Sequence, residues 1–222
     1  MTRIRLAAGV LLTWLAGAGS ASAQSPRAGA VEVAVGGMWI GHAKVASGDA
    51  NETTSTGGDF RLFGSSTTLS ATGGFEARVG VKLTNSFEVM AAGSYGTPQL
   101  RVALSNDAEG ATPVTASERI QQYTITGGVL WYLPNGDHER LSPFVEAEAG
   151  ISRNLHEGRS LVNSGRLFGA GGGVKIALGG GSGWVRSIGA RVDARAVVRS
   201  DPTVFDRRRV SPAIGVSLYL RF

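Results

Sequence analysis

The chain has 222 residues, of which 42% are hydrophobic and 33 are glycine, and its formal net charge is +5 at pH 7. The absence of cysteine excludes a disulfide framework, a thiol nucleophile and a Cys-ligated metal. The small excess of positive charge does not indicate a nucleic-acid partner. Many glycines with only seven prolines favour an all-β fold with tight turns.

The first 23 residues have the order of a secretory signal peptide. Arg3 and Arg5 precede the apolar run "LAAGVLLTWLAGAG", and Ala21 and Ala23 form a small-x-small cleavage site. The apolar run is shorter than the ~20 residues that a membrane-spanning helix needs. We therefore predict cleavage after Ala23 and a single mature domain over residues 24–222.

Eight later segments of about ten residues alternate between apolar and polar side chains, which predicts strands. They are residues 31–41, 74–83, 87–96, 121–133, 143–152, 166–178, 187–198 and 211–222. Short connections follow the second, fourth and sixth segments, and mostly longer ones follow the first, third, fifth and seventh. This alternation is typical of a membrane barrel, with short turns on one side and long loops on the other.

Charged residues gather on one face of these strands, and the apolar face carries no charge in mid-strand. The twelve charged residues are Glu32, Glu76, Arg78, Lys82, Glu88, Glu146, Glu148, Lys175, Arg191, Asp193, Arg195 and Arg221. A soluble lipocalin-like barrel would turn this face to water, and a membrane barrel would turn it inward. Three features favour the second: signs mixed enough for pairing, glycines at 169, 171 and 173 that leave room in a narrow lumen, and aromatic residues near strand ends.

The sequence therefore predicts an eight-stranded antiparallel up-and-down transmembrane β-barrel. A ten-stranded variant stays open if the first long connection, residues 42–72, contains a hairpin around "FRLFGSSTTLSA". Otherwise that Ser-, Thr-, Gly- and Asp-rich connection is expected to be a mobile loop.

The whole predicted mature chain resembles the small OmpA/OmpX-like outer-membrane β-barrels of Gram-negative bacteria. The resemblance lies in the pattern of strands, loops and a terminal aromatic residue. It implies an outer-membrane location with both termini in the periplasm. It also implies an assembly signal for the barrel assembly machinery in the last strand, at Gly215, Leu218, Leu220 and Phe222. Ala213 departs from the polar residue usual at its position.

Catalytic and metal sites receive little support from the sequence. His42, His138 and His156 all lie in predicted connections, without the serine and acid spacing of lipid A-modifying enzymes. Glu146 and Glu148 share a face, which suits acid–base chemistry, but ion pairing with lumen cations explains them better. We expect no enzyme activity, no cofactor and no metal, and a pore is disfavoured because so small a barrel is filled.

Four arginines lie beyond the apolar stretches at positions that keep the alternation of the lipid-facing side chains: Arg101, Arg119, Arg153 and Arg166. Because guanidinium groups pair with phosphates in bidentate fashion, we expect contacts with lipopolysaccharide phosphates. Ordinary loop charges are the alternative. The expected role is structural or in surface interaction, as a monomer surrounded by outer-membrane lipid. The open alternatives are a lipid A-modifying enzyme and a soluble ligand-binding barrel.

Overall fold

The computed structural model describes residues 28–53, 56–105, 111–134, 140–156, 162–180, 183–200 and 209–222. The predicted signal peptide and its cleavage residues, Ala21 and Ala23, lie outside this part. Eleven strands make up the described fold. They are β1 (Val31–Ile40), β2 (Ala43–Thr53), β3 (Asp59–Leu69), β4 (Thr72–Lys82), β5 (Phe87–Gly96), β6 (Gln99–Ser105), β7 (Val114–Tyr132), β8 (Leu141–His156), β9 (Val162–Gly180), β10 (Ser187–Ser200) and β11 (Arg209–Arg221).

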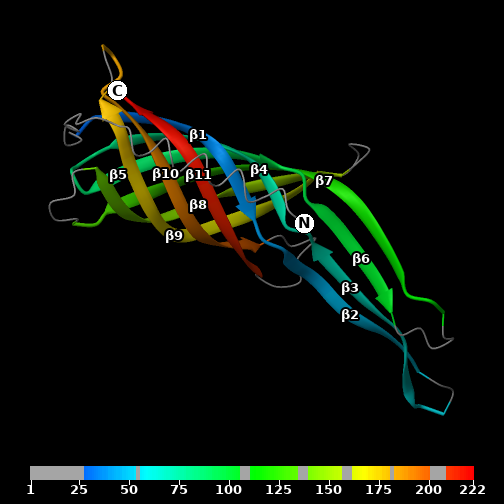
Figure 1. Cartoon of the computed structure of the whole chain (residues 1–222). Coiled ribbons are helices and arrows are strands. Elements are labelled where there is room, and N and C mark those ends of the chain that lie inside the picture. The colour runs from blue at the N-terminus through cyan, green and yellow to red at the C-terminus, as the bar shows by residue number, and fades with distance from the viewer. Residues whose placement is uncertain are drawn as a thin grey trace.

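Eight of the strands close into an antiparallel barrel in the order β1-β4-β5-β7-β8-β9-β10-β11 (Figure 1). Closure follows because β1 pairs with β4 on one side and with β11 on the other. At the end where β1 begins, the Phe222 amide donates to the Val31 carbonyl oxygen at 2.8 Å. We call this the terminal end. The prediction of an eight-stranded antiparallel barrel is confirmed.

The remaining strands form an extension that we call the tongue. It is a four-stranded antiparallel sheet in the order β2-β3-β6-β7, which uses only residues 114–119 of β7. Figure 1 shows it leaving the barrel at the end opposite the C-terminus, and we call that end the tongue end. The expectation of a mobile loop over residues 42–72 was wrong, because these residues pair as strands. The ten-stranded variant was also wrong, since β2 and β3 pair outside the barrel wall.

The tongue has one apolar and one polar face, fixed by the register of its strands. Leu69, Leu100 and Ala43 are neighbours across three strands, and Thr67, Val102 and Ala46 form the next row. Further out the apolar face becomes exposed, at Phe60, Phe63, Leu104 and Val114. The other face presents Lys44, Thr68, Arg101 and Ser117.

The parity of β7 relates these faces to the barrel. Gln122, Thr124 and Thr126 are buried inside the barrel, so the even-numbered residues of β7 point inward. Ala116 and Val114 continue this parity into the tongue. The apolar face of the tongue is therefore a continuation of the inner wall of the barrel.

The outer wall of the barrel is apolar and exposed. On adjacent strands Val79, Ala91 and Val129 all point outward, and nearly every exposed large hydrophobic side chain of the barrel strands belongs to this surface. Two pairs of aromatic rings mark its borders. Phe87 and Trp131 stack near the terminal end, with centroids 6.1 Å apart, and Tyr95 and Tyr123 lie 5.0 Å apart toward the tongue.

The eight residue steps from Phe87 to Tyr95 span about 26 Å along the strand, or roughly 20 Å once the strand tilt is allowed for. This height suits the apolar band of a membrane barrel. The described residues contain no helix of sufficient length and apolarity to cross a bilayer.

Candidate functional site

The inside of the barrel carries the charged residues. All twelve predicted lumen residues are buried, and they come from β1, β4, β5, β8, β9, β10 and β11. They are Glu32, Glu76, Arg78, Lys82, Glu88, Glu146, Glu148, Lys175, Arg191, Asp193, Arg195 and Arg221. Six carboxylates thus face six cations in a low-dielectric interior, where unpaired charge would be costly. The structure divides them into two clusters.

The central cluster joins three arginines to four carboxylates. Arg195 donates to Glu76 Oε2 and to Glu148 Oε1, each at 2.9 Å, and its Nε lies 3.1 Å from Asp193 Oδ2. Arg191 donates to Glu146 at 2.6 Å and to Asp193 at 3.0 Å. The third arginine, Arg78, bridges Glu76, Glu146 and Asp193.

The second cluster lies toward the terminal end and is centred on Lys175. Its Nζ donates to Glu32 Oε1 at 2.6 Å, to Glu88 Oε2 at 3.0 Å and to the Tyr132 hydroxyl at 2.7 Å. Arg221 pairs with the other oxygen of Glu32 at 2.8 Å. Lys82 Nζ lies 4.4 Å from the centroid of the Tyr132 ring, a cation–π contact. Sequence reasoning did not include Tyr132, although its even parity already placed it inside.

The glycines of β9 leave the space that these side chains occupy. A Cβ atom added at Gly169 would lie 2.6 Å from Glu148 Oε1, and one at Gly173 would lie 2.8 Å from the Asp193 Cα. A Cβ at Gly171 would collide with the backbone of β10 and with Arg195. Larger residues at these positions would displace the carboxylates and guanidinium groups of the central cluster.

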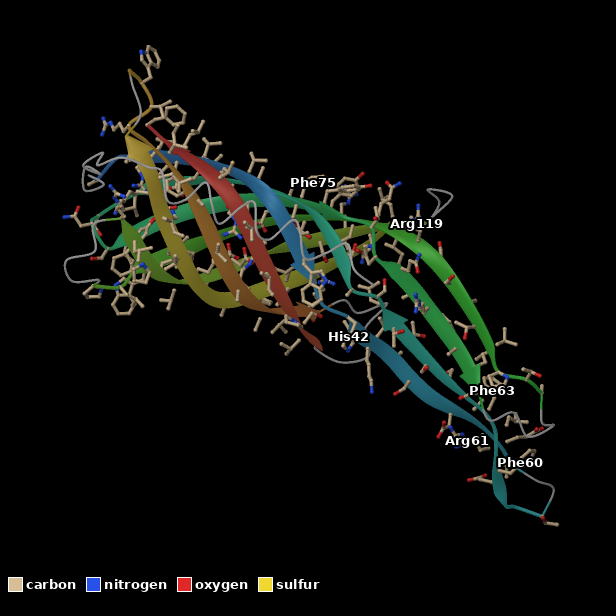
Figure 2. The ribbon with its side chains drawn as sticks, in the orientation of Figure 1. His42, Phe60, Arg61, Phe63, Phe75 and Arg119 are labelled. Carbon is tan, nitrogen blue, oxygen red and sulfur yellow. The ribbon has the colours of Figure 1, made fainter. Side chains whose placement is uncertain are left out.

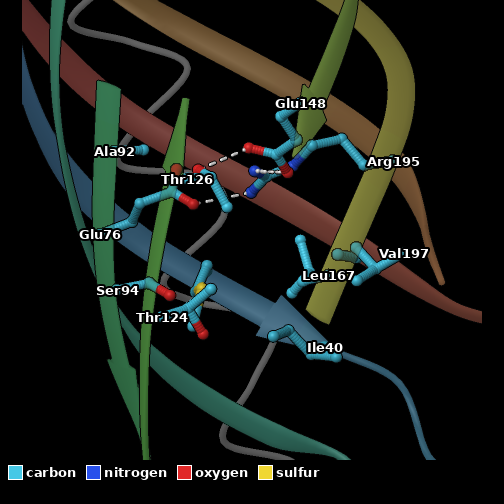
Figure 3. Close-up of a pocket in the computed structure, with 12 residues that line it drawn as sticks. Ile40, Glu76, Ala92, Ser94, Thr124, Thr126, Glu148, Leu167, Arg195 and Val197 are labelled. Carbon is cyan, nitrogen blue, oxygen red and sulfur yellow. Dashed lines mark hydrogen bonds and ion pairs between the residues drawn. The ribbon is translucent and has the colours of Figure 1, made fainter. Parts of the chain in front are cut away.

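A pocket lies between the central cluster and the tongue end (Figure 3). Glu76, Glu148 and Arg195 line its polar side, together with Thr124, Thr126 and Ser94. On its other side lies an apolar collar, the buried cluster made of Met38, Ile40, Leu167, Val197 and Ala213. The pocket contains about 340 Å³ of empty space, including the part open to solvent.

Arg199 is a buried cation that the sequence analysis missed. It is 3% exposed and lies on the inward face of β10, two residues beyond Val197. The predicted strand ended at Val198, which left Arg199 in a connection. The signal was present, since Arg191, Asp193, Arg195, Val197 and Arg199 continue one alternation.

The four predicted phosphate-binding arginines lie on the outside, exposed, at the tongue end. Arg101 is on β6, Arg119 on β7, Arg153 on β8 and Arg166 on β9, which are successive neighbours in the sheet. In the register, Arg101 opposes Ser117, two residues before Arg119, and Arg166 opposes Ile151, two residues before Arg153. Figure 2 shows Arg119 where the barrel meets the tongue. The four therefore form a band on one outer side.

Of the three histidines, only His42 has a described side chain. His42 is exposed between β1 and β2, as Figure 2 shows. His138 lies outside the described residues, and the side chain of His156 is not described. Within the described ranges, no group of three His, Asp or Glu side chains is arranged to hold a metal ion.

The predicted assembly residues all lie on β11 or just after it. Leu218 and Leu220 point outward and are exposed, Gly215 points inward against the Asp193 carboxylate, and Phe222 follows the last strand residue. Leu220 opposes Val33, and Leu218 opposes Val35, where β11 closes the barrel against β1.

Comparison with solved structures identifies the architecture. The outer-membrane protein OprG from Pseudomonas aeruginosa matches with a TM-score of 0.53 at 10% sequence identity, covering 90% of this chain and 98% of OprG. This chain has the fold of a small outer-membrane β-barrel. The exposed apolar wall and buried charges agree with that fold, and they do not fit the soluble ligand-binding barrel considered from the sequence.

Two structures of Ail, the attachment invasion locus protein of Yersinia pestis, match less well. The one in complex with the heparin analogue sucrose octasulfate has a TM-score of 0.44 at 13% identity and covers 88% of this chain and 99% of Ail. The other has a TM-score of 0.40 at 14% identity, with 88% and 100% covered. No protein-family model matches the chain, and no curated protein matches it significantly.

Proposed function

We propose that this outer-membrane barrel is a non-enzymatic surface protein whose tongue is the interaction surface. The terminal end faces the periplasm, and the tongue projects outside the cell. One end of the barrel holds the start of β1, the end of β11 and the strand ends that lead into the β4–β5, β7–β8 and β9–β10 connections, as in outer-membrane barrels with periplasmic turns. The filled lumen supports a structural rather than a conducting role, because Arg191 and Lys175 are almost completely buried within it.

The observation behind this proposal is the tongue itself. A sheet that served only to connect barrel strands would need no exposed apolar face, yet Phe60 and Phe63 are 41% and 38% exposed, and Val114 is 61% exposed. Figure 2 shows both phenylalanines toward the outer part of the tongue. Exposed apolar surface rimmed by polar residues is typical of interaction sites.

The test measures the orientation and independence of the tongue. A tag placed at Gly57, in the β2–β3 turn, should be labelled by antibody on intact cells, and a tag between β4 and β5 should not. Replacing residues 43–69 with a short turn should leave a barrel that still shows heat-modifiable gel migration. Labelling of only the β4–β5 tag would show that the orientation is the reverse of the proposed one. Loss of insertion without the tongue would show that the tongue is part of the barrel scaffold.

Lipopolysaccharide is proposed as the partner of the outer arginine band. Support comes from four guanidinium groups on neighbouring strands, exposed on the outer side where the aromatic border lies at Tyr95 and Tyr123. Replacing all four arginines with Gln should reduce the lipid A retained by the purified protein several-fold. Unchanged retention would refute this contact, and Arg61→Gln, a change on the tongue, is the matched control.

The non-enzymatic role has its own test. Lipid A extracted from cells with and without the protein should have identical acyl chains and phosphates by mass spectrometry. A mass shift that depends on expression and disappears in His42→Ala or His156→Ala would instead establish a lipid A-modifying enzyme.

A further inference from the structure

Among the described residues of the lumen, Arg199 is the exception in the charge pairing. Arg78, Arg191, Arg195, Arg221 and Lys175 each contact a carboxylate, and Lys82 lies over a tyrosine ring. Arg199 is as buried as these residues. Even so, its Nε and Nη2 atoms have no hydrogen-bond partner within the part of the chain that the structure describes.

The charge balance of the lumen shows that Arg199 is surplus. The other buried charges are six carboxylates and six cations, which compensate one another. Arg199 therefore adds one positive charge that the described interior does not neutralise. A buried guanidinium without a counter-charge is strongly unfavourable, so an anion at this position would stabilise the folded barrel.

The described neighbours of Arg199 do not supply that anion. In the register it opposes Leu167 on β9 and Arg209 on β11, and Val197 precedes it on the same face. Arg195, the closest member of the central cluster on this strand, lies four residues away, about 13 Å along the strand. The apolar collar occupies the space between them.

A second unpartnered donor lies beside it. Ser211 is 1% exposed, and its hydroxyl has no hydrogen-bond partner among the described residues. Ser211 opposes Val197, so Ser211 and Arg199 are diagonal neighbours on the inward face of adjacent strands. Such neighbours lie about 7–8 Å apart at the backbone, within reach of a long side chain. One small anion can therefore accept hydrogen bonds from both.

We propose that Arg199 and Ser211 form a binding site for a small organic carboxylate at the tongue end of the lumen. Arg199 would hold the two carboxylate oxygens in bidentate fashion, and the Ser211 hydroxyl would donate to one of them. The apolar collar beneath would cover a short aliphatic body. Lipid phosphates are not the ligand, since Arg199 faces inward and the outer arginine band lies on the opposite face of the wall.

The experiment uses the full chain in detergent micelles or nanodiscs, with hexanoate as the probe and the neutral hexanamide for comparison. Titration should give saturable hexanoate binding that weakens at least tenfold in Arg199→Gln and is partly restored in Arg199→Lys. Hexanamide should bind weakly to all of these variants. Arg61→Gln, an exposed arginine on the tongue outside the outer arginine band, is the matched control and should leave hexanoate binding unchanged.

Folding is followed separately, because a lost site must be distinguished from a lost barrel. Without ligand, Arg199→Gln should unfold at the same or a higher temperature than the original chain, since it removes an uncompensated buried charge. In the original chain, hexanoate should raise the unfolding temperature, and in Arg199→Gln it should not. A lower unfolding temperature for Arg199→Gln without ligand would show that the guanidinium is already paired, and would overturn the proposal.

Three further outcomes would also overturn it. The first is equal binding of hexanoate to the original chain and to Arg199→Gln. The second is displacement of hexanoate by equimolar inorganic phosphate, which would assign the site to a free oxyanion. The third is tighter hexanoate binding in Asp201→Asn or Asp206→Asn, which would show that a carboxylate of the chain itself occupies the site.

Discussion

Removal of Arg195 is the sharpest perturbation of the lumen, because this guanidinium contacts three carboxylates. After Arg195→Gln, Glu76 still contacts Arg78, and Asp193 still contacts Arg191 at 3.0 Å. Among the described residues, Glu148 would keep only the Thr126 hydroxyl, at 3.0 Å. One buried carboxylate thus loses its only cation, which costs about 3–5 kcal/mol of unfolding free energy.

The assay is reversible urea unfolding in lipid vesicles, followed by tryptophan fluorescence. The double variant Arg195→Gln/Glu148→Gln should recover roughly 2–3 kcal/mol of the loss, since it removes the stranded charge. Arg153→Gln, which is exposed on the outer wall, is the control and should change the stability by less than about 0.5 kcal/mol. A cost for Arg195→Gln no greater than the control, or no recovery in the double variant, would refute the ion-paired lumen.

Three further variants test other parts of the account. Val79→Arg, midway along β4 on the outer wall, should lower the unfolding free energy in lipid by about 2–4 kcal/mol. Leu83→Arg, at the terminal rim, should lower it by only about 0–1 kcal/mol. Equal losses for the two variants in the same unfolding assay would contradict a lipid-facing wall. Gly169→Ala should cost about 1–3 kcal/mol by displacing Glu148, whereas Gly179→Ala, with open space at its Cβ, should be neutral. Deleting Phe222 should lower several-fold the fraction of the protein that is inserted in the membrane of cells and shows heat-modifiable gel migration. Trp184→Ala, a change at an exposed residue near the same end, should not lower this fraction. Normal insertion without Phe222 would count against an assembly signal there.

The barrel could be predicted from the sequence because its two environments differ so strongly. Each wall strand has lipid on one side and a packed lumen on the other, so apolar and polar residues alternate with period two. This alternation assigned the inward face of β10, from Arg191 to Arg195, and the outward face of β11, from Pro212 to Phe222. The same rule placed Gly169 and Gly173 inside, where the structure brings carboxylates against them.

The tongue could not be predicted because its strands do not divide into a lipid side and a lumen side. Most of β2 has solvent on both faces, and the "GSST" segment of β3 carries only small or hydroxylated side chains. Such segments have the composition of loops, although β6 shows a weak alternation at Leu100, Val102 and Leu104. Pairing with neighbouring strands, which a single segment does not reveal, stabilises them here.

The ion pairs of the lumen were also beyond sequence reasoning. Parity assigns a residue to a face, but the height of that residue in the barrel depends on the stagger of the strands. Arg195 meets Glu76 and Glu148 across the lumen, whereas Lys175 meets Glu32 and Glu88 nearer the terminal end. For the same reason the sequence did not show that Arg199 lies too far toward the tongue end to contact any described carboxylate.

The central claim is that the apolar face meets lipid and the charged face fills the lumen. Ala91 and Ala92 test it most directly, because they are adjacent on β5 and the first is exposed while the second is 7% exposed. The chain contains no cysteine, so Ala91→Cys and Ala92→Cys each carry a single nitroxide label. In bilayers, the label at position 91 should collide freely with oxygen and hardly with a water-soluble nickel chelate, and the label at position 92 should be shielded from oxygen. Equal or reversed oxygen accessibility at the two positions would contradict the membrane barrel.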